Sequence, residues 1–298
     1  MLTDADVGFY REHGYVVLRD AIPAATIADL QRVTAAFIER SRSVAESDEV
    51  FDLDDGHGPD RPRLTRIKLP HKRHPAFAEL LHGERIRGIL SQLLGPNVAL
   101  QTSKLNTKAP GGGAAVEWHQ DWAFYPHTND DMLALAVMLD DVDEANGPLM
   151  VIPGSHLGPV LNHHTGGVFC GAIDPEDPTF RFDRAMTLTG KAGDVTIHHA
   201  RTLHGSAPNR SDRPRLILFF EAHAADAWPL LGAASYIHRL GQQAIWDDLH
   251  ARMICGTPVL EPRLEAVSVR LPLPPAPDAS SIFKSQKSGG ARSVFAAE

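Results

Sequence analysis

The middle of the chain is built from short runs of β-favouring residues separated by turns, and this pattern constrains the fold more than any other feature. The runs begin at Val98 and read VALQTSKLNTK, MLALAVMLDDV, LMVIPGS, AMTLTGKAGDVTIHH and RLILFFEAHA. Short β-favouring runs bounded by Gly and Pro are typical of strands. Because closure removes exposed sheet edges, the pattern predicts a jelly-roll or barrel with helices packed outside it.

Helices are expected before this β core. The first spans residues 3–14 and is followed by a strand-like YVVLRD. The second begins after Pro23 and carries apolar residues at steps of three and four positions, so one face is buried. A third is expected between residues 77 and 94. The acidic stretch 46–62, rich in Gly and Pro, is expected to be a surface loop.

We expect a single domain, because nothing in the middle of the 298 residues resembles a linker. It would comprise a helical N-terminal region 1–97, a β core at about 98–225 and a C-terminal part 226–298. Within the last part, residues 241–254 are expected to form a helix. Residues 271–298 are rich in Pro, Ser and Gly and are expected to be an extended tail without a chemical role.

Composition narrows the class of protein. Hydrophobic residues make up 43% and charged residues 22%, which is typical of folded proteins. The N-terminus has acids and no uninterrupted apolar run, so neither a signal peptide nor a membrane span is expected and we predict a cytoplasmic protein. Cys170 and Cys255 are expected to be free thiols. A net charge of −8 without a basic cluster disfavours nucleic acid as a partner.

A candidate metal site begins with His119-Gln120-Asp121. Residues i and i+2 of a strand project from the same face, so His119 and Asp121 can share one metal ion. With a distal histidine they would form the two-histidine, one-carboxylate triad of non-haem Fe(II) oxygenases, and His204 is the preferred third ligand. Four other histidines remain alternatives, although neighbours on a strand face opposite ways. They are His163, His164, His198 and His199.

Arg215 is the candidate site for an anionic co-substrate. It follows His204 by eleven residues, and its alternation with Ile217 and Phe219 predicts that it points inward. A buried arginine needs an anion, and its planar guanidinium can bind a carboxylate with two hydrogen bonds. We expect Arg215 and the distal histidine on adjacent strands joined by a turn. Arg210 and Arg213 are alternatives.

The run before the metal motif places Thr102, Lys104 and Asn106 on one strand face. That face is expected to line the pocket, with a solvated face as the alternative. Trp122 and Tyr125 follow the metal motif and would form either an aromatic wall or part of the core.

Together, these motifs resemble the phytanoyl-CoA dioxygenase (PhyH-type) family of Fe(II)- and 2-oxoglutarate-dependent oxygenases. The similar stretch runs from about residue 101 to 223. It contains the blocks WHQDWAFYPHT, NGPLMVIPGSHLGP, KAGDV and HGSAPNRSDRPRLIL. The resemblance implies a mainly β fold with flanking helices, whose core is a double-stranded β-helix of the jelly-roll, cupin-like type.

The resemblance also implies roles for single residues. His119, Asp121 and His204 match the iron ligands, Arg215 matches the arginine that binds the far carboxylate of 2-oxoglutarate, and Ser206 matches a hydroxyl position of the same pocket. Thr102 is then expected to contact the co-substrate. The expected substrate contacts are Lys104, Asn106 and Trp122.

The implied reaction is hydroxylation of a small-molecule metabolite, with 2-oxoglutarate and O2 consumed and succinate and CO2 released. Asp121 argues against halogenation, because halogenating relatives lack the carboxylate ligand. Two alternatives remain: a metal-binding or sensor protein without turnover, and an oxidase of the same fold that performs desaturation, cyclisation or epimerisation. No basic cluster suits the phosphates of CoA.

Overall fold

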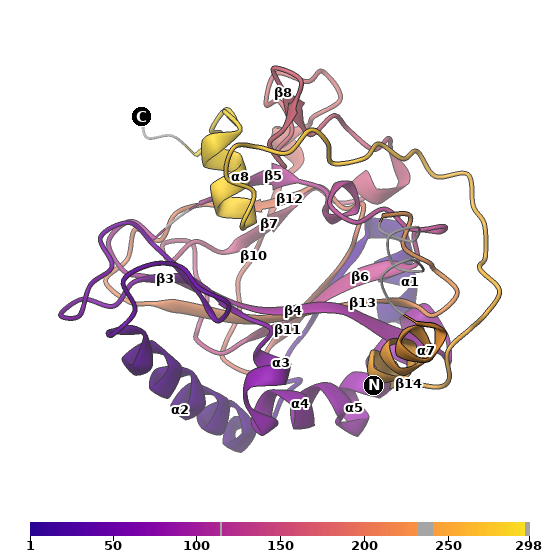
Figure 1. The fold of residues 1–298 in the computed structure, drawn as a ribbon, viewed down its shortest axis with the longest axis horizontal. Coiled ribbons are helices and arrows are strands. Elements are labelled where there is room, and N and C mark those ends of the chain that lie inside the picture. Colours follow the sequence, from indigo (N-terminus) through magenta and orange to yellow (C-terminus); the bar gives the residue numbers. More distant parts are fainter. Residues whose placement is uncertain (114, 232–240, 296–298) are drawn as a thin grey trace.

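Two β-sheets packed face to face form the centre of the protein in the computed structural model, which describes residues 1–113, 115–231 and 241–295 (Figure 1). The larger sheet has the order β1-β11-β6-β13-β4-β3-β2, with β14 also paired to β4. Its strands are β1 (Tyr15–Leu18), β2 (Phe51–Leu53), β3 (Leu64–Lys68), β4 (Val98–Lys108), β6 (Met132–Met138), β11 (Val195–His199), β13 (Arg215–Ala224) and β14 (Met253–Cys255).

The smaller sheet has the order β10-β7-β12-β5 and lies across the sandwich from the larger one. Its strands are β5 (Val116–His119), β7 (Leu149–Val151), β10 (Met186–Leu188) and β12 (His204–Ser206), and a separate hairpin joins β8 (His164–Thr165) to β9 (Val168–Phe169). The strand pairings in both sheets and in the hairpin are antiparallel. The predicted jelly-roll, double-stranded β-helix core is confirmed.

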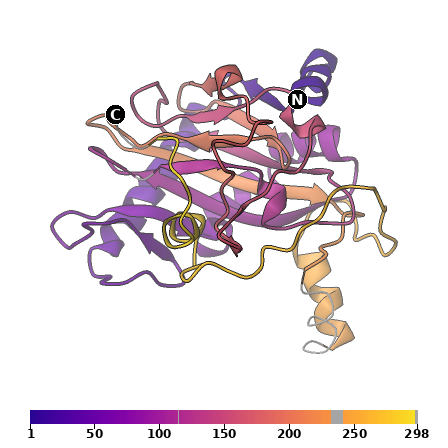
Figure 2. The same cartoon turned by 90° about the horizontal axis from the view of Figure 1, so that it is seen from above.

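Helices α2 to α5 cover the outer face of the larger sheet, whereas α8 lies beside β5 of the smaller sheet (Figure 1), and Figure 2 shows the orange helix α7 projecting away from the sheets. The helices are α1 (Asp4–His13), α2 (Ala24–Ser41), α3 (Pro70–Arg73), α4 (Pro75–His82), α5 (Glu84–Leu94), α7 (Gln242–Ala251) and α8 (Ile282–Ser288). Among the residues that the structure describes, no helix is long and apolar enough to cross a membrane. Cytoplasmic location and the single-domain organisation stay predictions.

Strand β6 is buried on both faces of the larger sheet, against the helices on one side and against the interior of the sandwich on the other. Leu133, Leu135 and Val137 join the core beneath the helices, whereas Ala134 and Ala136 face the interior of the sandwich. A strand that is buried on both faces is apolar throughout, which is why MLALAVM lacks polar alternation. The small alanines leave room between the sheets for a site.

Three local predictions were wrong. The helix expected at 77–94 is broken at Gly83, whose extended backbone (φ −64°, ψ 148°) separates α4 from α5. The loop expected at 46–62 contains β2, because Phe51 is buried and pairs with Ile67 of β3. The tail expected to be extended contains α8, which begins after Ser281, whose side chain accepts a hydrogen bond from the Lys284 N–H.

Two other predictions hold. Helix α1 begins at a capping box between Thr3 and Asp6 and ends at Gly14, which adopts the left-handed conformation (φ 76°). Cys170 and Cys255 are both buried free thiols.

Candidate active site

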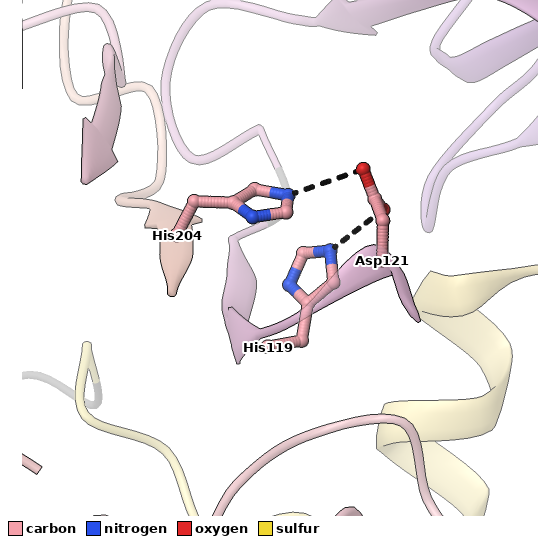
Figure 3. A group of neighbouring side chains, drawn as sticks. All are labelled: His119, Asp121 and His204. Atoms are coloured by element: carbon pink, nitrogen blue, oxygen red, sulfur yellow. Dashed lines mark ion pairs between the residues drawn. The ribbon is translucent and has the colours of Figure 1, made fainter. Parts of the chain in front are cut away.

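His119, Asp121 and His204 converge between the two sheets (Figure 3). His119 ends β5 and lies directly opposite His204 of β12. Asp121 begins a 3-10 turn rather than continuing the strand, but Gln120 keeps an extended backbone and so Asp121 still projects to the side of His119. The Nε2 atoms of His119 and His204 lie 3.6 Å and 3.8 Å from carboxylate oxygens of Asp121.

Hydrogen bonding leaves the two histidines ready to bind a metal. Nδ1 of His119 lies 2.8 Å from the Glu117 carbonyl oxygen, and Nδ1 of His204 lies 2.9 Å from that of Thr202. A carbonyl can only accept, so each Nδ1 carries the proton and each Nε2 presents a lone pair toward Asp121. Two imidazole nitrogens and one carboxylate are the donor set that suits non-haem Fe(II). The residues therefore fit this metal.

The charge states agree with this chemistry. Burial lowers the pKa of His204 well below its usual value and so keeps the imidazole neutral at neutral pH. Burial would raise the pKa of Asp121, but the neighbouring His204 and Lys104 hold it well below its usual value. A neutral imidazole and an ionised carboxylate are the forms that bind a metal.

Of the alternative histidines, His198 lies nearest to the triad. Its Nε2 is 3.4 Å from Asp121 Oδ2, and neither ring nitrogen has a hydrogen-bond partner among the described residues. His199 faces elsewhere: its Nδ1 accepts the N–H of Arg201, and its ring contacts that of His156. His163 Nε2 accepts the N–H of Gln120, and His164 Nε2 contacts the Leu273 carbonyl oxygen.

Arg215 lines the same cavity of about 40 Å³ as the three triad residues. Its residue surface is 3% exposed, and its Nε has no hydrogen-bond partner among the described residues. Burial lowers its pKa to about 10, which still leaves the guanidinium charged at neutral pH. The expectation that His204 and Arg215 lie on adjacent strands was wrong: β12 belongs to the smaller sheet and β13 to the larger, so the turn that joins them crosses the sandwich.

Ser206 and Lys108 lie close to Arg215, because Lys108 pairs with Arg215 across β4 and β13 and Ser206 lines the same cavity. The Oγ of Ser206 accepts a hydrogen bond of 2.8 Å from Nζ of Lys108. Lys108 is 1% exposed, and burial together with Arg215 lowers its pKa well below the usual value. Sequence reasoning missed Lys108, although its even spacing after Lys104 and Asn106 was visible.

The predicted pocket strand is divided between two cavities. Lys104 and Asn106 line the cavity of the triad and Arg215 (the iron cavity), whereas Thr102 lines an adjoining cavity of about 290 Å³ with Tyr125. Lys104 forms an ion pair with Glu221, which also accepts a hydrogen bond from Tyr125. Trp122 lines neither cavity: it is 1% exposed and its Nε1 donates to the Ser268 carbonyl oxygen, so the core alternative describes it.

Arg66 is a second residue that sequence reasoning missed. It lies on β3, lines both cavities, and donates from Nε to Oδ1 of Asn106 at 3.2 Å. Burial lowers its pKa, although the negative charges of Asp52 and Glu221 act against that shift. Among the described residues, Arg66 has no ion pair, in contrast to Lys104.

Comparison with known proteins gives consistent matches. The family described as "Phytanoyl-CoA dioxygenase (PhyH)" matches residues 10–217. The chain is 37% identical to a probable alpha-ketoglutarate-dependent hypophosphite dioxygenase of Stutzerimonas stutzeri, over 93% of this chain and 95% of that protein. It is 29% identical to an ectoine dioxygenase of Bordetella parapertussis, over 73% and 74% of the two chains.

A solved structure supports the same assignment. EctD from S. alaskensis with bound Fe superposes with a TM-score of 0.63 at 26% identity, over 75% of this chain and 77% of that one. The predicted activity and the predicted iron and 2-oxoglutarate requirement are thereby confirmed. The chain belongs to the phytanoyl-CoA dioxygenase family and is an Fe(II)- and 2-oxoglutarate-dependent dioxygenase.

Proposed function

We propose that His119, Asp121 and His204 bind the iron of this dioxygenase and leave its opposite face open. The observation that carries the proposal is the pair of Nε2 lone pairs directed at one ionised carboxylate. When bound, iron and 2-oxoglutarate supply with O2 the oxidising chemistry: one oxygen atom enters the substrate and the other enters succinate, with release of CO2. The protein positions the reactants and keeps water out.

Arg215 is the proposed anchor for the far carboxylate of 2-oxoglutarate. The Arg215 guanidinium is buried on the wall of the triad's cavity, and its Nε has no hydrogen-bond partner among the described residues. A carboxylate, an anion with two oxygens, can accept two hydrogen bonds from it and neutralise its charge. Lys108 Nζ donates a hydrogen bond to the Ser206 Oγ. Because this oxygen acts as an acceptor toward Lys108, its own proton is free to be donated to the same carboxylate. Thr102 lies in the adjoining cavity, which supports a role near the substrate rather than the co-substrate.

The proposed substrate is a small anion. Of the charged side chains that line the adjoining cavity, Lys104 pairs with Glu221, Lys68 with Asp52 and Glu49 with Arg73, and Asp121 is a proposed iron ligand. Arg66 adds a positive charge that has no ion pair among the described residues. An uncompensated, partly buried cation favours a monoanion. His198 offers a further ring nitrogen beside Asp121. The 37% identical relative is named for hypophosphite, a monoanion of three heavy atoms.

Hypophosphite is therefore the first substrate to test. Hydroxylation of one P–H bond would give phosphite, in step with one succinate and one CO2. Purified protein with Fe(II), 2-oxoglutarate and O2 is incubated with hypophosphite, phosphite or the zwitterion ectoine, and succinate and phosphorus products are measured. We expect equal amounts of succinate and phosphite from hypophosphite. Succinate formation that depends on ectoine and on neither anion would overturn the anionic class.

A further inference from the structure

The C-terminal segment 280–295 reaches the iron cavity through Ile282 of helix α8. Helix α8 runs beside β5, and Figure 3 shows this yellow helix close to Asp121. Ile282, the first residue of α8, lines both the iron cavity and the adjoining cavity, as Arg66, Lys104 and Asp121 do. Its side chain therefore stands where the two spaces meet.

Gln286 fixes α8 to the strand that carries an iron ligand. Its Oε1 accepts the Glu117 N–H at 2.9 Å, and its Nε2 donates to the carbonyl oxygens of Glu117 (3.3 Å) and Gly171 (3.0 Å). Gln286 is 6% exposed, so these bonds are shielded from water. Since Glu117 precedes His119 by two residues, the helix is attached next to the triad.

The Glu117 side chain holds the end of the segment. Its carboxylate accepts hydrogen bonds from Ser293 Oγ at 2.6 Å and from the Val294 N–H at 2.9 Å. One residue of β5 thus binds the C-terminal segment through both its backbone and its side chain. This attachment brings Ile282 to the cavity.

The remaining contacts of α8 are weaker. The Phe283 ring lies 5.7 Å from the Arg66 guanidinium, and Lys287 forms an exposed ion pair with Asp55. A cavity of about 270 Å³, lined by Leu53 and Thr65 among others, lies beside the helix. The connection from Gly256 to Ser281 contains no helix and only one isolated bridge. Among the described residues, the apolar contacts of the segment with the core come after α8, where Val294 and Phe295 pack against the cluster of Trp118, and no residue of α8 belongs to a core cluster. A helix held by few apolar contacts opens locally at low cost, and long irregular connections often carry lids.

We propose that α8 is a lid on the iron cavity and that Ile282 determines how large a substrate can reach the iron. The proposal rests on the iron site proposed above. With the lid closed, Ile282 occupies the volume that a substituent on the substrate would need. Hypophosphite is then accepted, and the same anion with one P–H replaced by P–CH3, methylphosphinate, is disfavoured.

The size limit is tested with Ile282→Ala. In the wild type, kcat/KM should favour hypophosphite over methylphosphinate, because one methyl group in an apolar contact is worth about 10- to 200-fold. Ile282→Ala should reduce this preference by about tenfold or more, with an unchanged 2-oxoglutarate midpoint in the anaerobic Fe(II) protein. Lys287→Ala, a change on the exposed side of the same helix, should leave the preference as it is. An equal preference in wild type and Ile282→Ala would overturn the role of Ile282.

The lid is tested without any substrate, by the anaerobic transfer of Fe(II) from the 2-oxoglutarate complex to the chelator ferrozine. Gln286→Ala removes three hydrogen bonds from α8 and should speed iron transfer about tenfold or more, whereas Lys287→Ala should not. Hydrogen exchange at α5 should be the same in both variants, which shows that the rest of the fold is intact. Transfer at the wild-type rate from Gln286→Ala would refute the lid.

The two tests separate the proposals. If the wild type does not bind one Fe(II) or shows no 2-oxoglutarate charge-transfer band, the proposed iron site fails. If both are seen but hypophosphite is not oxidised, only the substrate fails, and iron transfer still decides the lid.

Discussion

Arg215 and Lys108 lie directly opposite each other across β13 and β4, and both side chains are buried. Opposed like charges destabilise a sheet unless one is lost or an anion joins them. Burial and Arg215 together lower the pKa of Lys108, and its Nζ donates to oxygens of Ser206 and Ala207. Arg215 has no such acceptors among the described residues, so it is the cation that a co-substrate would neutralise.

Replacing Arg215 tests this anchor. Arg215→Lys keeps the charge but loses the two-pronged geometry, and a charge-assisted hydrogen bond is worth about 1.5–3 kcal/mol. The 2-oxoglutarate midpoint, measured from the charge-transfer band of the anaerobic Fe(II) protein, should weaken by about ten- to a hundredfold. Arg215→Ala should be worse. Iron affinity without co-substrate should barely change, because Arg215 is not a proposed ligand.

Arg213 provides the control for that titration. Its side chain is half-exposed and pairs with Asp143 at the surface, so Arg213→Ala should leave the midpoint unchanged. A larger shift for Arg213→Ala than for Arg215→Ala would require a different anchor.

The distal iron ligand is tested by comparing His204 with His199, its near neighbour in the sequence. His204→Ala should abolish binding of stoichiometric Fe(II), as should His119→Ala, whereas His199→Ala should retain it because its ring lies against His156. Metal content after anaerobic loading measures the effect. Full iron content in His204→Ala combined with loss in His199→Ala would reverse the assignment.

Asp121→Gly removes the carboxylate and opens one more position on the metal. We expect loss of hydroxylation, with at most traces of chlorinated product at high chloride, detected by mass spectrometry. Undiminished hydroxylation would exclude Asp121 from the metal's ligands.

Arg66→Met tests the recognition of an anionic substrate. Loss of one charge-assisted hydrogen bond should raise KM for hypophosphite by about ten- to a hundredfold, with an unchanged 2-oxoglutarate midpoint. Arg61→Met is the matched control, since Arg61 is exposed and lines neither cavity. Equal effects of the two substitutions on KM would contradict a specific role of Arg66.

Local spacing was enough to predict part of the site. The i, i+2 relation of His119 and Asp121 and the inward phase of Arg215 are properties of extended backbone, and the structure gathers all three at one cavity. The same rule could not separate Trp122 from the pocket, because the 3-10 turn Asp121–Ala123 interrupts the strand and turns this side chain into the core.

Other parts of the site depend on tertiary packing. Arg66 lies in a stretch without a motif and reaches the cavity only because β3 pairs with β4. Ile282 belongs to a segment whose composition resembles a tail, and α8 is stabilised by the hydrogen bonds between its Gln286 and Glu117 of the distant strand β5 rather than by its own propensity. No pattern within those segments reveals either contact.

The carbonyl oxygen of Glu117 accepts hydrogen bonds from both His119 and Gln286. An iron ligand and the C-terminal helix thus share one acceptor, and the position of each affects the other's hydrogen bond. Thermodynamic linkage then requires reciprocity: the factor by which a docked α8 strengthens iron binding equals the factor by which iron strengthens docking. Iron binding and the docking of α8 are therefore coupled, and a measurement of either one reports on the other.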